Sequence, residues 1–219
     1  MLTIYGANLS SPSNKVRFTA NAIGLDYTYR AVKLREGENK QEWFLKINPF
    51  GKIPAIDDDG FTLFESNAIC RYLLSKHKSP LYPTELKQRA LIDQWVDFGS
   101  MHIGMSVSRL TWNRVFAPML KVPVDEQSLK DGLNFLDKFL PITEAHLKKN
   151  KFFAGPQMTY ADINILSGLD PAEASGLDLT KYTALTSWRN NLKSQSFYTK
   201  CHKDYADALK AMMPAAAAR

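Results

Sequence analysis

The stretch LTIYGANLSSPSNKVRFTANAIG, residues 2–24, predicts a strand, a turn and a helix in immediate succession. The apolar run Leu2–Tyr5 predicts a short strand. The second half of the stretch has the apolar spacing of a helix, which Ser11 can cap, Pro12 can open and Gly24 can stop. A strand followed directly by a helix is the first unit of an α/β domain.

The alternation of strands and helices continues to residue 76. Alternating and hairpin patterns predict strands over residues 27–31, 53–56 and 61–64, and helical patterns cover residues 41–47 and 66–76. The acidic turn Asp57–Gly60 joins the last two strands as a hairpin. The order β-α-β-α-β-β-α fits a four-stranded mixed sheet with helices on its faces. We therefore expect an α/β domain over residues 1–77.

A different pattern follows a proline-containing linker at residues 78–84. Residues 85–219 contain no convincing strand and predict an all-α domain. Long helical patterns cover residues 85–117 and 125–147; we expect Pro118 to end or kink the first, and Pro141 to kink the second. Thr159–Asp162 is a variant of the capping box and predicts another helix. The small-residue tail, residues 214–219, is expected to fray.

Charge and composition exclude several classes of protein. The chain has 219 residues, a net charge of +6 and a pI of about 9.2, but its basic residues are dispersed apart from the cluster Lys148–Lys151, which disfavours a nucleic-acid binder. No apolar run approaches a membrane helix, and residues 1–15 lack the basic leader of a signal peptide. Two cysteines rule out a disulfide framework, and the four histidines lack zinc-site spacing. We expect a cytoplasmic protein without metal, nucleic acid or membrane partners.

Three features of the first domain indicate one anion-binding pocket. The turn Asn8–Pro12 places two hydroxyls beside the free backbone N–H groups of a helix N-terminus. Pro54 cannot donate to a sheet and is a candidate for a cis peptide, which leaves the backbone of Ile53 free to pair with an extended peptide. Glu65 suits an ammonium group, and Ser66 at a helix start suits a carboxylate. Taken alone, the two helix starts are more commonly explained as helix caps, and Pro54 also fits an ordinary edge proline.

Together these features describe a glutathione site, and the sequence resembles the cytosolic glutathione transferases. The matching stretches are YGANLSSPSNKVR, NPFGKIPAI, FTLFESNAICRYL, LTWNRVFAPML and KKNKFFAGPQMTYADINIL, in family order along nearly the whole chain. LFESNAI and LTWNRVFAPML are most similar to the serine-type phi and theta classes. The resemblance implies a thioredoxin-like domain followed by a helical domain, an enzyme that uses glutathione as co-substrate, and a homodimer.

The resemblance also implies roles for individual residues. The catalytic hydroxyl falls on Ser10, with Ser11 as the neighbouring candidate. Glutathione would contact the backbone of Ile53 beside Pro54, the γ-glutamyl-binding pair Glu65 and Ser66, and the glycyl-binding lysines Lys40 and Lys52. Asn39 stands where phi and theta members often have histidine. The two lysines are equally explained as solvated surface charges.

The electrophile is expected in the cleft between the domains, against the long helix. The candidates for its wall are Met105, Leu110, Trp112 and Phe116, each of which also suits a bundle core. Arg109 matches an active-site arginine of theta members, and it also suits an ion pair between helices.

Three other functions on the same fold remain open. A cysteine-type glutathione-dependent reductase needs a thiol in the first turn, yet no cysteine precedes Cys70, which is expected to be a buried small hydrophobe. A zeta-like isomerase would have SSCS where this chain has SSPS, so Pro12 replaces the cysteine. A binding or assembly module without catalysis is the third. The excess positive charge suits one small anion, with Lys40, Lys52 and Arg109 around it.

Overall fold

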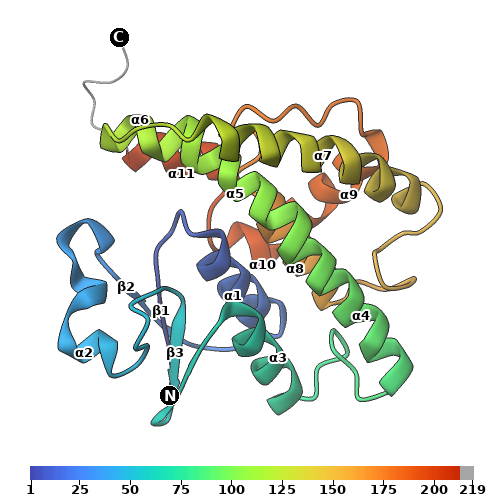
Figure 1. Cartoon of the computed structure of the whole chain (residues 1–219). Helices are drawn as coiled ribbons and strands as arrows, with labels where there is room; N and C mark the ends of the chain where they lie inside the picture. Colours follow the sequence, from blue (N-terminus) through green and yellow to red (C-terminus); the bar gives the residue numbers. More distant parts are fainter. Residues whose placement is uncertain (213–219) are drawn as a thin grey trace.

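Four strands form a mixed sheet in the order β2-β1-β3-β4 (Figure 1). The computed structural model describes residues 1–212, and its strands are β1 (Leu2–Gly6), β2 (Thr28–Ala31), β3 (Ala55–Asp58) and β4 (Phe61–Phe64). β1 runs parallel to β2, with Ile4 opposite Tyr29, and antiparallel to β3, with Ile4 opposite Ile56. β3 and β4 form the predicted hairpin. The predicted mixed sheet is confirmed.

Helices cover both faces of this sheet, because successive side chains of a strand point to opposite sides. Helices α1 (Ser11–Ala22) and α3 (Ser66–Lys76) pack on one face, where Ile4 and Ile56 enter the main hydrophobic core. The short helix α2 (Glu42–Leu45) packs on the other face, where Phe44 joins a smaller core with Tyr5 and Ala55. Two 3₁₀ turns, η1 (Leu34–Glu36) and η2 (Glu38–Lys40), lead into α2.

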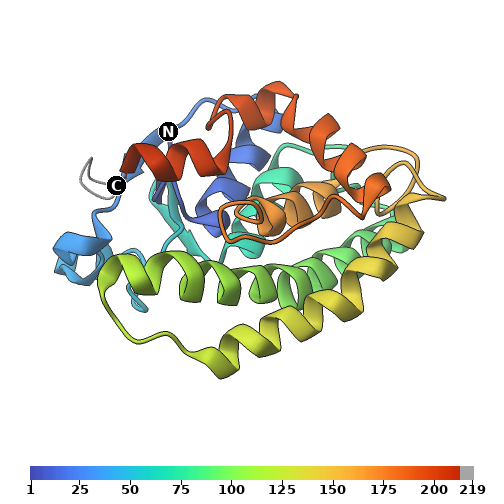
Figure 2. The same cartoon turned by 90° about the horizontal axis from the view of Figure 1, so that it is seen from above.

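The rest of the described chain is helical, apart from an isolated bridge between Phe152 and Gly155. One helical path comprises α4 (Leu86–Phe98), the π-helical segment η3 (Gly99–Gly104), α5 (Met105–Thr111), the π-helical segment η4 (Trp112–Phe116) and α6 (Ala117–Leu120). It runs beside α7 (Glu126–Leu147), as Figure 2 shows. α8 (Tyr160–Leu169), α9 (Thr183–Lys193), α10 (Ser196–Thr199) and α11 (Tyr205–Met212) complete the fold.

The prolines act less sharply than expected. The helical path continues past Pro118 and ends at Leu120, and α7 runs through Pro141 without interruption. The kink at Pro141 stays a prediction, and residues 214–219, for which fraying was predicted, lie outside the described residues.

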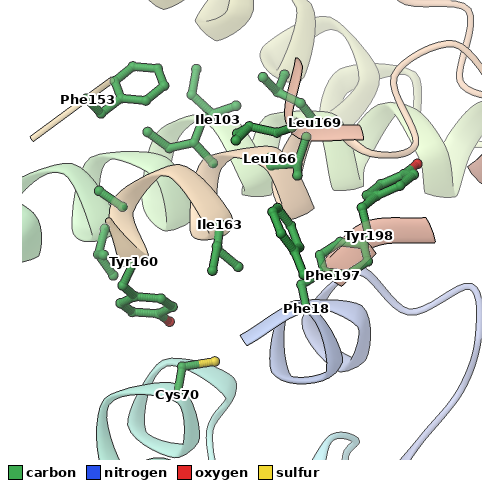
Figure 3. Packing of buried hydrophobic residues seen from close by; sticks show 14 of the residues in the cluster. Phe18, Cys70, Ile103, Phe153, Tyr160, Ile163, Leu166, Leu169, Phe197 and Tyr198 are labelled. Carbon is green, nitrogen blue, oxygen red and sulfur yellow. The ribbon is translucent and has the colours of Figure 1, made fainter. Parts of the chain in front are cut away.

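Helix α8 lies at the centre of the molecule and is buried on nearly every side. Figure 3 shows Tyr160 of α8 facing Cys70 of α3, and Phe18 of α1 packed against Phe197 and Tyr198. The rings of Phe18 and Tyr198 are 5.0 Å apart between centroids. This packing joins the α/β domain to the helical region through one continuous core.

The predicted capping box fixes the start of α8. The backbone N–H of Thr159 donates to Oδ2 of Asp162 over 2.9 Å, and Oδ1 of Asp162 accepts from the indole N–H of Trp188 over 3.0 Å. Asp162 is fully buried, and burial raises the pKa of its carboxyl. Its hydrogen bonds replace the water that burial removes.

Glycines allow α8 to cross the long helical path closely. A Cβ added to Gly168 would lie 3.1 Å from Cα of Gly104, and one added to Gly99 would lie 2.5 Å from Cγ1 of Ile165. Only residues without a side chain permit this approach. Between residues 1 and 212, no helix is both long and apolar enough to cross a membrane.

Candidate active site

A cavity of about 1090 Å³ lies where the carboxyl end of β1 meets the helical region. Its lining comes from the turn before α1, the segment after β2, the start of α3, the helical path, α8 and α11. Ser10, Ser11, Ile53, Glu65, Ser66, Met105, Trp112 and Phe116 all line it. Eight of the residues that the sequence analysis singled out therefore share one cavity.

Ser10 caps α1 at the edge of this cavity. Its backbone is extended, with φ −94° and ψ 108°, and its Oγ accepts from the backbone N–H of Ser13 over 3.3 Å. Because the cap uses a lone pair of Oγ, the hydroxyl proton remains free to be donated. Ser11 is the first residue of α1 and is also half-buried. Both hydroxyls stand at the positive end of a 12-residue helix.

Glu65 holds a strained backbone at the start of α3. Its φ of 68° lies in the left-handed region that favours glycine. Strain of this kind persists where the surrounding structure enforces it, often at functional sites. The exposed Glu65 carboxylate and the half-buried Ser66 hydroxyl both reach the cavity as a result.

The segment before β3 presents free backbone to the same cavity. The Ile53–Pro54 peptide bond is cis, as predicted. Ile53 lines the cavity, whereas Pro54 is buried beside it. Within residues 1–212 the backbone of Ile53 forms no hydrogen bond, so its N–H and C=O are available to an extended ligand.

The structure does not place the other three predicted glutathione contacts on the cavity wall. Lys40 and Lys52 are exposed, and Asn39 is half-buried. The Asn39 amide donates to the carbonyl of Gly51 over 2.7 Å, so it ties two loops together. None of the three is part of the cavity lining, and their contacts with glutathione stay predictions.

The residues predicted for the electrophile wall divide between the cavity and the core. Met105, Trp112 and Phe116 line the cavity, and Trp112 is 46% exposed. Leu110 is fully buried and, like Arg109, faces Gly132 of α7 on the opposite side of the helical path.

Arg109 stands outside the cavity lining. Its guanidinium carbon lies 5.9 Å from the ring centroid of Phe135. Arg109 forms no salt bridge among the described residues, and its active-site role stays a prediction.

Sequence reasoning missed two cavity residues with strong polar contacts. Lys15 lies one helical turn after Ser11, a spacing that would have placed it on the cavity side of α1. It is 8% exposed, and burial lowers the pKa of its ammonium to about 8. Tyr205 of α11 donates its hydroxyl to the carbonyl of Leu9 over 2.6 Å. Tyr205 and Leu9 are 196 positions apart, so no local sequence pattern could have predicted this hydrogen bond.

Neither cysteine of the chain lines the cavity. Cys70 is fully buried, and burial raises the pKa of its thiol. Burial also raises the pKa of Cys201 to about 11. Both thiols therefore stay protonated at neutral pH. Among residues 1–212, no three His, Cys, Asp or Glu side chains are grouped to hold a metal ion.

Comparison with known families agrees with this architecture. Residues 1–75 match the model of the glutathione S-transferase N-terminal domain, and residues 105–196 match that of its C-terminal domain. The chain belongs to the glutathione S-transferase family, whose members are enzymes, and the predicted resemblance is confirmed.

Individual relatives support the assignment over most of the chain. Glutathione S-transferase F10 of Arabidopsis thaliana is 36% identical over 166 residues, which are 74% of this chain and 77% of the relative. Glutathione transferase F7 of Populus trichocarpa has a similar structure, with a TM-score of 0.85 and 29% identity over 92% of this chain and 97% of the poplar chain. Glutathione S-transferase-I, solved with the ligand lactoylglutathione, has a TM-score of 0.83 and 29% identity over 95% of this chain and 99% of its own.

Proposed function

We propose that this enzyme ionises the thiol of glutathione against the hydroxyl of Ser10 and conjugates the thiolate to an apolar electrophile. The observation that carries the proposal is the position of Ser10, at the N-terminus of α1 and in the same cavity as Met105, Trp112 and Phe116. The similarity to glutathione S-transferase-I, which was solved with a glutathione derivative, supports glutathione as the ligand of this cavity.

The energy needed for this activation is within the reach of one hydroxyl. A free thiol has a pKa of about 8.5, so half-ionisation at pH 7 requires a decrease of about 1.5 units, or roughly 2 kcal/mol. A hydrogen bond to a charged group contributes roughly 1.5–3 kcal/mol, and a helix N-terminus adds roughly 0.3–1 kcal/mol. Ser10 therefore need not act as a base. The thiol proton passes to solvent water in the cavity, and the Ser10 hydroxyl then donates to the thiolate that remains.

The rest of glutathione would extend along the site from Ser10. Glu65 would pair with the glutamyl ammonium and Ser66 with the glutamyl carboxylate, both at the start of α3. The unpaired backbone of Ile53 would bind the cysteinyl unit in the manner of an added strand. Lys40 and Lys52 would reach the glycyl carboxylate only by turning their long exposed side chains towards it.

The position of the cysteines favours the transferase over a cysteine-type reductase. In such a reductase the enzyme's own thiolate attacks a disulfide and must be accessible. Here the reactive sulfur would arrive with the substrate, because Cys70 and Cys201 lie outside the cavity.

We also propose a homodimer in the cytoplasm. Exposed apolar side chains gather on α4 and η3, where Leu86 is 77%, Leu91 48% and Met101 64% exposed. We place the dimer interface on these helices, within residues 66–110. Sedimentation equilibrium that showed only a monomer at micromolar concentration would refute the dimer.

The test of the activation step is a pH titration of the thiolate absorbance of bound glutathione. In the parent enzyme we expect the pKa of the bound thiol to lie about 1.5 units below its free value, and in Ser10→Ala to return most of the way to about 8.5. Ser11→Ala shows whether the hydroxyl belongs to the neighbouring residue, and Ser75→Ala, at an exposed position of α3, is the control. The same thiol pKa in the parent and in Ser10→Ala would refute the role of Ser10.

A further inference from the structure

Lys15 is a buried cation that the proposed reaction leaves without a function. Its Nζ donates to Oδ1 of Asn67 over 2.7 Å and to Oγ of Ser66 over 3.3 Å. Turning the amide of Asn164, which satisfies its polar atoms better, adds a contact of 3.1 Å from its oxygen to Lys15. All three acceptors are neutral, and none of the salt bridges in residues 1–212 includes Lys15.

A buried charge without an opposite charge is costly, and most proteins pair or remove it. Lys15 nevertheless lines the cavity, so an anion that enters the cavity can approach it. The titratable groups that influence it are Cys70 and Arg71 of α3, and Glu65 at the N-cap of α3. Cys70 is neutral and Arg71 is cationic, and Glu65 is exposed. A ligand carboxylate would be the missing partner.

The contact with Ser66 also sets the direction of a hydrogen bond. An ammonium group has three donors and no acceptor, so Oγ of Ser66 must accept from Lys15. The hydroxyl proton of Ser66 then has to point elsewhere, and Ser66 lines the cavity. A hydroxyl that is oriented in this way is prepared to donate to an anion.

We propose that Lys15 is the counter-charge for the glutamyl α-carboxylate of glutathione and orients the Ser66 hydroxyl to donate to that carboxylate. The inference rests on the proposed function and adds a charge to the binding of its co-substrate. It assigns Lys15 to binding and positioning and leaves activation of the thiol to Ser10. Lys15 is therefore expected to affect the KM for glutathione strongly and kcat little.

The test compares two ligands that lack a free thiol. S-methylglutathione keeps the glutamyl α-carboxylate, and its analogue with that carboxylate converted to an amide removes the charge. Calorimetric titration measures both with the parent, Lys15→Met, Lys15→Arg and the control Lys87→Met, at an exposed position of α4. We expect Lys15→Met to weaken binding of the carboxylate ligand by about 30-fold or more, and to change binding of the amide only slightly. Lys15→Arg, which keeps the charge, should restore part of the loss.

Each outcome bears on the inference. Equal losses for both ligands in Lys15→Met would mean a structural role and would overturn it, as would an unchanged affinity for the carboxylate ligand. If Lys15→Met fails to fold, Lys15→Gln keeps a donor for Asn67 and Ser66 without the charge and is measured in its place. A parent enzyme that binds neither ligand would refute the proposed function itself, whereas binding of both with no dependence on Lys15 would refute only this inference.

Discussion

The hydrogen bond between Tyr205 and Leu9 can be removed by the substitution Tyr205→Phe, which deletes one hydroxyl. Tyr205 is 1% exposed, and its hydroxyl lies 2.6 Å from the carbonyl oxygen of Leu9, the residue before Ser10. The variant leaves that carbonyl without its partner in a buried position. We expect the free energy of unfolding to decrease by about 1–3 kcal/mol. For a chain of this size, a loss of about 2 kcal/mol lowers the melting temperature by roughly 4–8 °C.

The same change should also affect activity, because it releases the turn that carries Ser10. If the freed turn weakens the hydrogen bond from Ser10 to the thiolate by about 1 kcal/mol, kcat/KM decreases roughly fivefold. The assays are thermal unfolding and steady-state kinetics at a fixed pH. The pKa of the bound thiol, measured as above, should rise together with the decrease in kcat/KM.

Tyr198→Phe is a matched control for this prediction. Tyr198 is equally buried, and its hydroxyl donates to Oδ1 of Asp170 over 2.7 Å, but it does not line the cavity. It should cost stability without changing the pKa of the bound thiol. The reasoning fails if Tyr205→Phe melts and turns over like the parent, or if Tyr198→Phe raises the thiol pKa by as much as Tyr205→Phe.

Two further predictions test which side chains contribute to substrate binding and which to the free energy of unfolding. Leu110→Ala should lower the free energy of unfolding by about 2–5 kcal/mol, because Leu110 is fully buried, whereas Trp112→Ala should mainly raise the KM for an apolar electrophile. Denaturant unfolding and steady-state kinetics distinguish the two variants. A greater loss of stability in Trp112→Ala than in Leu110→Ala would contradict the assignment. Glu65→Gly should relieve the backbone strain of a φ of 68°, so the free energy of unfolding should stay unchanged or rise by up to about 1 kcal/mol. The KM for glutathione should increase, and an unchanged KM would remove Glu65 from the site.

Local structure determines the position of the predicted residues that line the cavity. Ser10, Glu65 and Ser66 stand at helix starts, and Ile53 precedes a proline, so a few neighbouring residues determine where they lie. Helix caps and prolines impose backbone geometry over one turn, which a pattern of residue types can reveal. Each strand of the sheet was predictable for the same reason, because a strand is short and has its own pattern, and the β3–β4 hairpin is local in sequence.

Positions that depend on contacts between distant segments could not be predicted in the same way. Leu110 and Trp112 lie on opposite sides of the helical path, as residues two positions apart in a helix do, but only the packing of α7 decides which side faces the cavity. The two π-helical segments η3 and η4 shift the helical register around them, and the sequence contains no signal for these segments. The spacing from Ser11 could have placed Lys15 on the cavity side of α1, but its polar contacts lie 51 and 52 residues away on α3, where no local pattern reveals them.

The glycine crossing between α8 and the long helical path also has a consequence for changing what the enzyme accepts. Gly99, Gly104 and Gly168 line the cavity as well as the crossing, so this part of the cavity wall is backbone without side chains. Substituting the surrounding side chains can widen or narrow the cavity or change its polarity, but the glycines have no side chain to shorten. Beside the glycines, the room available to a substrate is therefore set by how closely α8 approaches the long helical path. Smaller side chains at Met105, Trp112 and Phe116 can make room for larger substrates. Enlarging the cavity beside the glycines would require the helices themselves to move apart.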